Sequence, residues 1–540
     1  RPSGARREAQ RSLTGLGELV RLVLRRDRVR LALWVGALVA LMAVSAAQVR
    51  SLYASPAAIA SYVAAVEDNP ALVTFSGPGY GFDRPNTGVI LVNETSLWMA
   101  LGCALMSLFL VVRHTRAEEE SERADLVRSG VVGRHAGAAA VLAVALAANT
   151  LVGIGAAGAS IALGYGVAGS VALAASFAAV GWAFAGAAAV AAQVVGASRA
   201  ALGLGAAAVG AAFVGRGVSD VSAPALSWLS PFGWGIGVRA FAGERWWTLV
   251  GLAALGAALA GAAFALSVRC DLGSGLAHPR AGRSRAPGWI THPLGLALLL
   301  QRGALIGWTV GVFVTGLLYG SVADDIESLL ADNPQLADYL AQLGGASVTD
   351  AYLATSFTML ALLASGFAVS SALRNRSEEA AGFAESMLAT PLSRWRWALD
   401  HLVVTVAGAA LVVSAGGLGV GLGYAAAVGD AGQVGRLTAS ALATLPAVLT
   451  LVGVAAVLFG WAPRAAAAAW AALAAVVVVG VFGELLRLPS PLRNLSPLEQ
   501  APARPAEPWR ITPLVLLSLV SLALMAFGLL GFRRRDLAVA

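Results

Sequence analysis

Long apolar runs alternate with short polar segments along most of the chain. A membrane-spanning helix needs about 20 mostly apolar residues, and twelve runs come close to that length or exceed it. They lie at 31–49, 95–112, 136–163, 169–195, 200–218, 246–268, 303–322, 353–373, 398–424, 437–461, 465–486 and 512–532. The first run is too long for the apolar part of a signal peptide, and no clear cleavage site follows it. The pattern predicts an all-α polytopic membrane protein with about twelve transmembrane helices.

Composition agrees with this class and narrows the chemistry. Of the 540 residues, 58% are hydrophobic and 13% are charged, whereas soluble domains carry about 25% charged residues. All 38 basic residues are arginine. A P-loop needs a lysine on the nucleotide phosphates, so this chain is not expected to hydrolyse ATP by itself. We predict no catalytic residues and no cofactor bound by this chain.

The residue types that form metal and redox sites are sparse. The two cysteines, Cys103 and Cys270, form no disulfide framework, and the five histidines show no metal-ligand spacing. No metal site is predicted. A match to GxGxxG at Gly421, Gly423 and Ala426 lies in an apolar, glycine-rich run. Close helix packing explains this match better than a nucleotide site does.

Arginine clusters predict the orientation in the membrane. They fall within 21–30, 113–134, 280–285, 374–396 and 533–535, all on one side of a twelve-helix arrangement. The positive-inside rule places that side, with both termini, in the cytoplasm. Residues 12–29 carry an apolar stripe flanked by arginines, which predicts an amphipathic helix on the cytoplasmic membrane surface; a frayed basic tail is the alternative. Loops 50–94 and 323–352 are then expected to face outward.

The chain contains an internal repeat. Five short matches recur in the same order about 264–274 residues apart: Trp34 with Trp308, "DNPAL" at Asp68 with "DNPQL" at Asp332, "SRAA" at Ser198 with "PRAA" at Pro463, "LSP" at Leu229 with Leu495, and "RCDL" at Arg269 with "RRDL" at Arg534. Two tandem six-helix halves are therefore predicted, related by a pseudo-two-fold axis along the membrane normal.

The repeat sets the expected domain boundaries. Residues 1–30 are a cytoplasmic segment with the amphipathic helix, and 31–268 are the first transmembrane half. Residues 269–302 are a cytoplasmic linker with a second such helix, 303–532 are the second half, and 533–540 are a cytoplasmic tail.

Each half carries a charged island after its second run. The islands read "RAEEESERADLVRSG" over 116–130 and "RSEEAAGFAESMLAT" over 376–390. In the first, Glu118, Glu122 and Asp125 are spaced to share one face of a helix. A solvated connector would explain one such island. Because the island recurs at the same place in both halves, we favour a docking surface for a cytoplasmic partner.

At this level the chain resembles the permease subunit of type-2 ABC exporters. Its fused twelve-span form resembles actinobacterial exporters of polyketide antibiotics, of the tetronasin-transport type. The resemblance implies that the islands are coupling helices that contact a separate ATPase subunit, present in two copies, with ATP and Mg²⁺ bound in that partner. The coupling residues implied are Glu118, Glu119, Asp125, Arg134, Glu378, Glu379, Glu385 and Arg394.

The resemblance also implies an exporter of hydrophobic or amphipathic, drug-like compounds in a bacterial plasma membrane, with no nucleic-acid partner. By analogy with the family, the substrate path is expected at Trp98, Met106, Phe109, Phe213, Phe357, Met359 and Phe367. Lipid-facing or core packing is the alternative for each of these. An ion-coupled drug antiporter is the second interpretation, disfavoured because the predicted spans hold few ionisable residues. A membrane scaffold without transport is a third.

Overall fold

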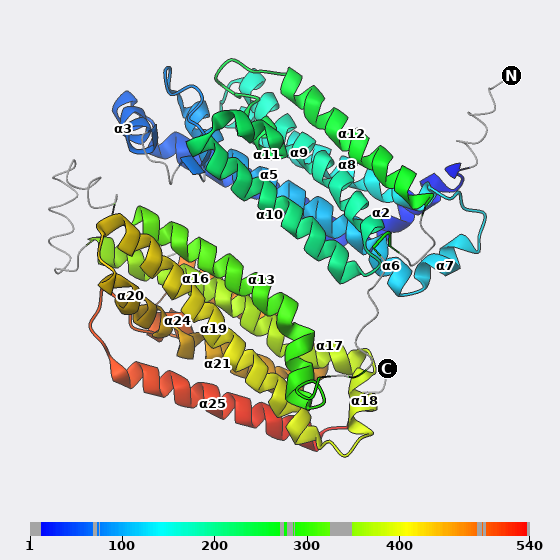
Figure 1. The fold of residues 1–540 in the computed structure, drawn as a ribbon. Coiled ribbons are helices and arrows are strands. Elements are labelled where there is room, and N and C mark those ends of the chain that lie inside the picture. The colour runs from blue at the N-terminus through cyan, green and yellow to red at the C-terminus, as the bar shows by residue number, and fades with distance from the viewer. Residues whose placement is uncertain are drawn as a thin grey trace. The chain divides into compact units, whose positions relative to one another are not determined.

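The computed structural model describes residues 12–67, 73–74, 76–269, 275–277, 285, 287–324, 348–482, 489 and 493–536. These residues are predominantly helical, and their β-type pairing is an isolated bridge between Val195 and Ala277. The chain divides into two compact units, unit 1 over Arg1–Gly282 and unit 2 over Arg283–Ala540. Figure 1 shows each unit as a set of long helices with short helices at the ends.

Unit 1 contains eleven described helical segments. They are α2 Leu16–Leu52, α3 Pro56–Glu67, α5 Thr87–Arg113, α6 Arg116–Glu120, α7 Arg123–Arg128, α8 Ala136–Ala162, α9 Val167–Val194, α10 Ser198–Ser222, the 3-10 helix η1 Pro224–Leu229, α11 Pro231–Ile236 and α12 Trp247–Ser267.

Unit 2 also contains eleven described helical segments. They are α13 Pro293–Val322, α16 Val348–Ala372, α17 Arg374–Ala380, α18 Phe383–Leu388, α19 Arg394–Val428, α20 Gly432–Leu442, α21 Leu445–Trp461, the 3-10 helix η2 Pro463–Ala465, α22 Ala468–Phe482, α24 Pro497–Gln500 and α25 Ile511–Arg534.

The described helices confirm an all-α polytopic membrane protein. Eleven of them are long and apolar enough to cross a membrane. The predicted run at 465–486 corresponds to α22, whose apolar part, Ala468–Gly480, is shorter. The count of twelve spans and the pseudo-two-fold axis therefore stay predictions. The two "DNP" motifs lie outside the described residues.

The expected amphipathic helices are not separate elements. Residues 16–29 form the first part of α2, which continues without interruption to Leu52. No proline or glycine occurs from Glu18 to Val35 to break the hydrogen-bond ladder. In the second half, α13 likewise runs continuously from Pro293 to Val322. Each surface segment is thus a continuation of the spanning helix.

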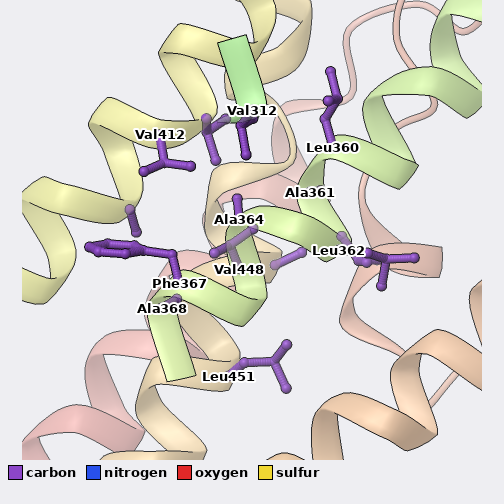
Figure 2. Packing of buried hydrophobic residues seen from close by; sticks show 14 of the residues in the cluster. Val312, Leu360, Ala361, Leu362, Ala364, Phe367, Ala368, Val412, Val448 and Leu451 are labelled. Atoms are coloured by element: carbon purple, nitrogen blue, oxygen red, sulfur yellow. The ribbon is translucent and has the colours of Figure 1, made fainter. Parts of the chain in front are cut away.

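Each unit has one or two central helices with the others around them. The apolar window of each long helix is its most apolar 18-residue stretch. In unit 1, 78% of the residues in the apolar window of α9 and 72% of those in that of α5 are buried, compared with 17% for α2. In unit 2, α16 is central, and Figure 2 shows its buried residues Ala364 and Phe367 among Val312 of α13, Val412 of α19 and Val448 of α21.

Glycines bring α13 and α19 into backbone contact. A Cβ on Gly320 would lie 2.1 Å from the carbonyl oxygen of Val420, and one on Gly423 would lie 2.2 Å from that of Leu317. Gly421 packs in the same way against Val434 of α20. The glycine-rich run is therefore a close helix-packing surface, as the sequence indicated.

Candidate functional site

Each charged island folds as two short helices with a break between them. Island 1 (residues 116–130) contains α6 and α7, and island 2 (residues 376–390) contains most of α17 and all of α18. At the breaks, Glu122 and Gly382 adopt the left-handed conformation. The prediction that Glu118, Glu122 and Asp125 share one helix face is wrong, because α6 ends at Glu120. Asp125 belongs to the next helix, α7.

Glu118 of island 1 pairs with the N-terminal helix. Its Oε1 accepts a hydrogen bond from Nη1 of Arg26 at 2.6 Å and lies 2.9 Å from Nδ1 of His114. The other ring nitrogen of His114, Nε2, lies 2.9 Å from Oδ2 of Asp27. Asp27 is 3% exposed and also pairs with Arg113. These contacts join α2, the end of α5 and α6 in one polar network.

The next two carboxylates of island 1 are also paired, Glu119 within α6 and Glu120 with α10. Glu119 accepts a hydrogen bond at 2.6 Å from the buried Arg116, whose guanidinium also donates to the carbonyl of Ala192 at the end of α9. Glu120 accepts hydrogen bonds from the backbone N–H of Ser198, at 2.8 Å, and from the Ser198 hydroxyl. Glu120 therefore caps the N-terminus of α10.

Island 2 is held by a different set of partners. Glu378 pairs with Arg374 at 2.9 Å and with Nε2 of His401, on α19, at 3.3 Å. Glu379 accepts two hydrogen bonds from Arg535, at 2.6 and 2.7 Å. Both carboxylates are buried. The acids Glu118 and Glu119 of island 1 and Glu378 and Glu379 of island 2 thus pair within their own unit, because burial of a carboxylate is tolerated only beside a cation or hydrogen-bond donors.

The surface that each island leaves exposed comes from its second short helix. Leu126 of α7 is 77% exposed and Phe383 of α18 is 65% exposed. Asp125 and Glu385 lie on the same exposed helices. Among the six predicted coupling acids, these two are the exposed ones, and the predicted arginines Arg134 and Arg394 are exposed as well.

The repeated arginines Arg134 and Arg394 join helices within each unit. Arg134 donates to the carbonyls of Ser267 and Val268 at the end of α12, both at 3.1 Å. Arg394 donates to the carbonyl of Arg535 at the end of α25, at 3.1 Å. A cation beside the unsatisfied carbonyls of a helix C-terminus is stabilising. Each arginine therefore fixes the start of the third long helix of its unit to the end of the last.

A cavity of about 350 Å³ adjoins island 1. Leu19 and Val23 of α2 supply apolar lining, and Glu118, Arg134 and His135 supply polar lining. Burial, together with the positive charge of Arg134, lowers the pKa of His135. In the part of the chain that the structure describes, no three His, Cys, Asp or Glu side chains are grouped to hold a metal ion.

Comparison with known proteins places the chain in a family. Residues 290–533 match the family model described as the C-terminal domain of the multidrug efflux system permease Rv1217c. The multidrug efflux system permease protein Rv1217c of Mycobacterium tuberculosis is 39% identical over 541 residues, which cover 99% of this chain and 98% of the relative. The chain belongs to this family of multidrug efflux system permeases. The similarity to this relative extends over both units of the chain.

The predicted path residues of the permease do not share one environment. Met106, Phe357 and Phe367 are buried in the cores of their units, and Figure 2 shows Phe367 beside Val412. Met359 is half-buried against the core of unit 2. The rings of Trp98 and Phe213 lie 6.3 Å apart in unit 1.

The seventh predicted path residue of the permease, Phe109, is exposed at the surface of α5. It is 46% exposed, and its ring lies 6.2 Å from that of Trp34 on α2. Exposure of Phe109 and burial of Met106 on the same helix mean that α5 presents one face to its core and another outward. The assignment of these seven residues to a substrate path stays a prediction.

Sequence reasoning missed a buried ion pair near the C-terminal end of α10 of the permease. Arg216, which is fully buried, pairs with Asp220 at 2.8 Å and donates to the carbonyl of Thr74. Ser227 donates to the same aspartate. The signal was present in the sequence, since an Arg and an Asp four residues apart interrupt an otherwise apolar run at helical spacing. Asp27 and His114 were also unpredicted. Asp27 is an isolated acid among the arginines of 21–30, and His114 lies just after the second apolar run.

Proposed function

We propose that this permease is the membrane-spanning subunit of an ATP-driven ABC-type exporter. It moves hydrophobic or amphipathic, drug-like compounds out of the cell, and two copies of a separate nucleotide-binding subunit supply the energy. The observation that carries the proposal is the full-length similarity to a multidrug efflux system permease. The repeated helix–break–helix islands support it, because a machine driven by two similar subunits needs two similar contact elements.

The proposal assigns the contact with the ATPase to the exposed helices α7 and α18. Among the described side chains, Leu126 of α7 and Phe383 of α18 are large, apolar and exposed, with Asp125 directly before the first and Glu385 two residues after the second. Large apolar side chains at a protein surface mark contact sites, and a rim of charge sets their specificity. The partner surface is expected to offer an apolar groove with basic residues at its edge.

Topology and cargo belong to the same proposal. The arginine distribution favours a bacterial plasma membrane with both termini and both islands in the cytoplasm. Cargo of the polyketide antibiotic type is a narrower hypothesis that rests on the resemblance of the fused form alone. ATP and Mg²⁺ bind in the partner subunit under this proposal.

An ion-coupled antiporter is the alternative, and the Arg216–Asp220 pair is the observation that favours it. Ionisable residues within membrane helices often mark ion pathways. Here Asp220 also accepts a hydrogen bond from Ser227, and Arg216 also donates to Thr74. These hydrogen bonds explain the pair by a structural role in α10, without an ion pathway.

Co-purification with a coexpressed candidate ATPase tests the proposal. The permease with Leu126→Ala and Phe383→Ala is compared with wild type and with Leu229→Ala, which removes an 83% exposed leucine beyond the other end of α10. We expect wild type and the Leu229 variant to retain the ATPase and the double variant to lose it. Failure of wild type to bind any ATPase would contradict the proposed function, and equal retention by all three would remove the docking assignment. An imposed pH gradient that drives transport without ATP would favour the antiporter.

A further inference from the structure

The two islands share their internal ion pairs. His114 contacts Glu118 at 2.9 Å in island 1, and Arg374 contacts Glu378 at 2.9 Å in island 2. The same correspondence relates the pair Arg116–Glu119 to the pair Arg376–Glu379. Both pairs are local, since their members lie three or four residues apart. The internal contacts therefore follow from the repeat and do not distinguish the islands.

The contacts that leave island 1 reach α2, α10 and, through the buried Arg116, the carbonyl of Ala192 at the end of α9. Glu118 and His114 bond to Arg26 and Asp27 of α2. Glu120 bonds to Ser198 at the start of α10. The apolar windows of α2 and α10 are 17% and 28% buried within the unit, whereas that of α9 is 78% buried. Island 1 is thus joined to two of the less buried long helices of unit 1 and to the end of the most buried one.

The bond between Glu120 and Ser198 has a specific structural role. The residue before α10, Ala197, has no side chain that can cap the helix. The free N–H groups of a helix N-terminus favour a negative acceptor. Glu120 provides that acceptor from a different element, so the position of island 1 and that of α10 are linked.

The second half lacks this link. The repeat places Ala380 where island 1 has Glu120, and Pro463 where α10 has Ser198. Alanine has no acceptor, and proline has no backbone N–H to donate. Gln301, at the position that corresponds to Asp27, bonds to Ser371 of α16 and not to island 2.

Island 2 is instead held by side chains of α19, of the residue after α25 and of an apolar cluster of unit 2. Glu378 pairs with His401 of α19, and Glu379 pairs with Arg535 after α25. Arg535 also lies over the rings of Phe459 and Phe532, which stack at 5.1 Å. In α18, Ala384 is buried in the same cluster, whereas none of the described side chains of α7 is buried.

We propose that the two islands act unequally: island 1 passes movement to α10 through Glu120, and island 2 has no corresponding link. The proposal rests on the proposed function, because the movement comes from the ATPase. Glu120 is the positioning residue that passes displacement of island 1 to α10. Loss of this residue should uncouple transport from hydrolysis and leave binding of the ATPase intact.

Transport per ATP hydrolysed, measured in proteoliposomes with the reconstituted complex, tests this. Glu120→Ala removes the link, and Glu120→Gln retains an acceptor oxygen. Asp430→Ala is the matched control: this exposed carboxylate caps its own helix α20 by accepting from Gly432, and it joins no second helix. We expect Glu120→Ala to reduce transport per ATP at least tenfold, and the Gln variant and the Asp430 variant to stay within about twofold of wild type.

Hydrogen–deuterium exchange of the same complexes, with and without a trapped nucleotide, gives an independent readout. In wild type, nucleotide should change exchange at the start of α10, and Glu120→Ala should abolish that change while leaving residues 394–403 of α19 as in wild type. Normal transport per ATP in Glu120→Ala, or an unchanged nucleotide response at α10, would overturn the inference. Both results presuppose a bound, active ATPase, so they are distinct from the failure of the proposed function itself.

Discussion

Glu122 and Gly382 hold the same left-handed backbone conformation at corresponding positions of the two islands, with φ of 56° and 76°. Glycine adopts this conformation without steric cost, whereas a residue with a Cβ is strained by about 1–2 kcal/mol. Both islands therefore break into two helices at the same place, although only one of them has the residue suited to the break. Island 1 keeps its shape at a local cost.

Replacing Glu122 with glycine should relieve that strain. We expect Glu122→Gly to stabilise island 1 by about 1 kcal/mol, and Gly382→Ala to destabilise island 2 by a similar amount. No atom lies within 4 Å of a Cβ built on Gly382, so the backbone alone sets the cost. Hydrogen exchange of residues 116–130 and 376–390 measures both effects. If Glu122→Gly destabilised island 1 and Gly382→Ala stabilised island 2, the left-handed φ would not determine the stability of the break.

Breaking the Glu379–Arg535 pair should destabilise unit 2. Glu379→Gln leaves the partly buried Arg535 without its carboxylate, and breaking a buried pair costs about 3 kcal/mol. We expect a lower thermal unfolding midpoint for the purified permease. The double variant Glu379→Gln, Arg535→Met removes both charges and should recover most of the loss. If the single variant unfolds at the wild-type temperature, the pair does not hold island 2.

The glycine contact between α13 and α19 should not accept a methyl group. Gly320→Ala places a Cβ 2.1 Å from the carbonyl oxygen of Val420, and overpacking of this kind costs about 1–3 kcal/mol. Gly311→Ala on the same helix is the control, because no atom lies within 4 Å of its Cβ. We expect detergent-solubilised Gly320→Ala to unfold at lower temperature and the control to match or exceed wild type. Equal midpoints would mean that the two helices can separate at little cost.

The buried Arg216–Asp220 pair should matter more for stability than for ion coupling. Arg216→Met leaves Asp220 unpaired inside α10 and removes the bond to Thr74, at an expected cost of about 3–5 kcal/mol. Adding Asp220→Asn should restore much of the stability. Transport by the double variant should remain insensitive to an imposed pH gradient. A double variant that is stable but gains or loses a response to the gradient would instead favour ion coupling.

The sequence alone was sufficient for the class of the protein, the positions of the apolar helices and the existence of the two islands. Helix length and hydrophobicity are local properties, so each apolar run predicted one helix without knowledge of its neighbours. The repeat was visible because short matches such as Ser198 with Pro463 recur at nearly constant spacing. The same comparison explains why Glu120 has a partner in one half and Ala380 has none in the other.

Only the tertiary structure decided which faces of the islands are free. Glu118 reaches Arg26 across 92 positions of sequence, and Glu379 reaches Arg535 across 156. No local periodicity encodes such contacts. From the sequence alone, an acidic cluster is therefore interpreted as an exposed surface, because its distant partners are not known. The physical reason is the cost of burying charge: acids that approach the helix bundle must find arginine or histidine there. What remains exposed then includes the apolar side chains Leu126 and Phe383, which the charge pattern did not single out.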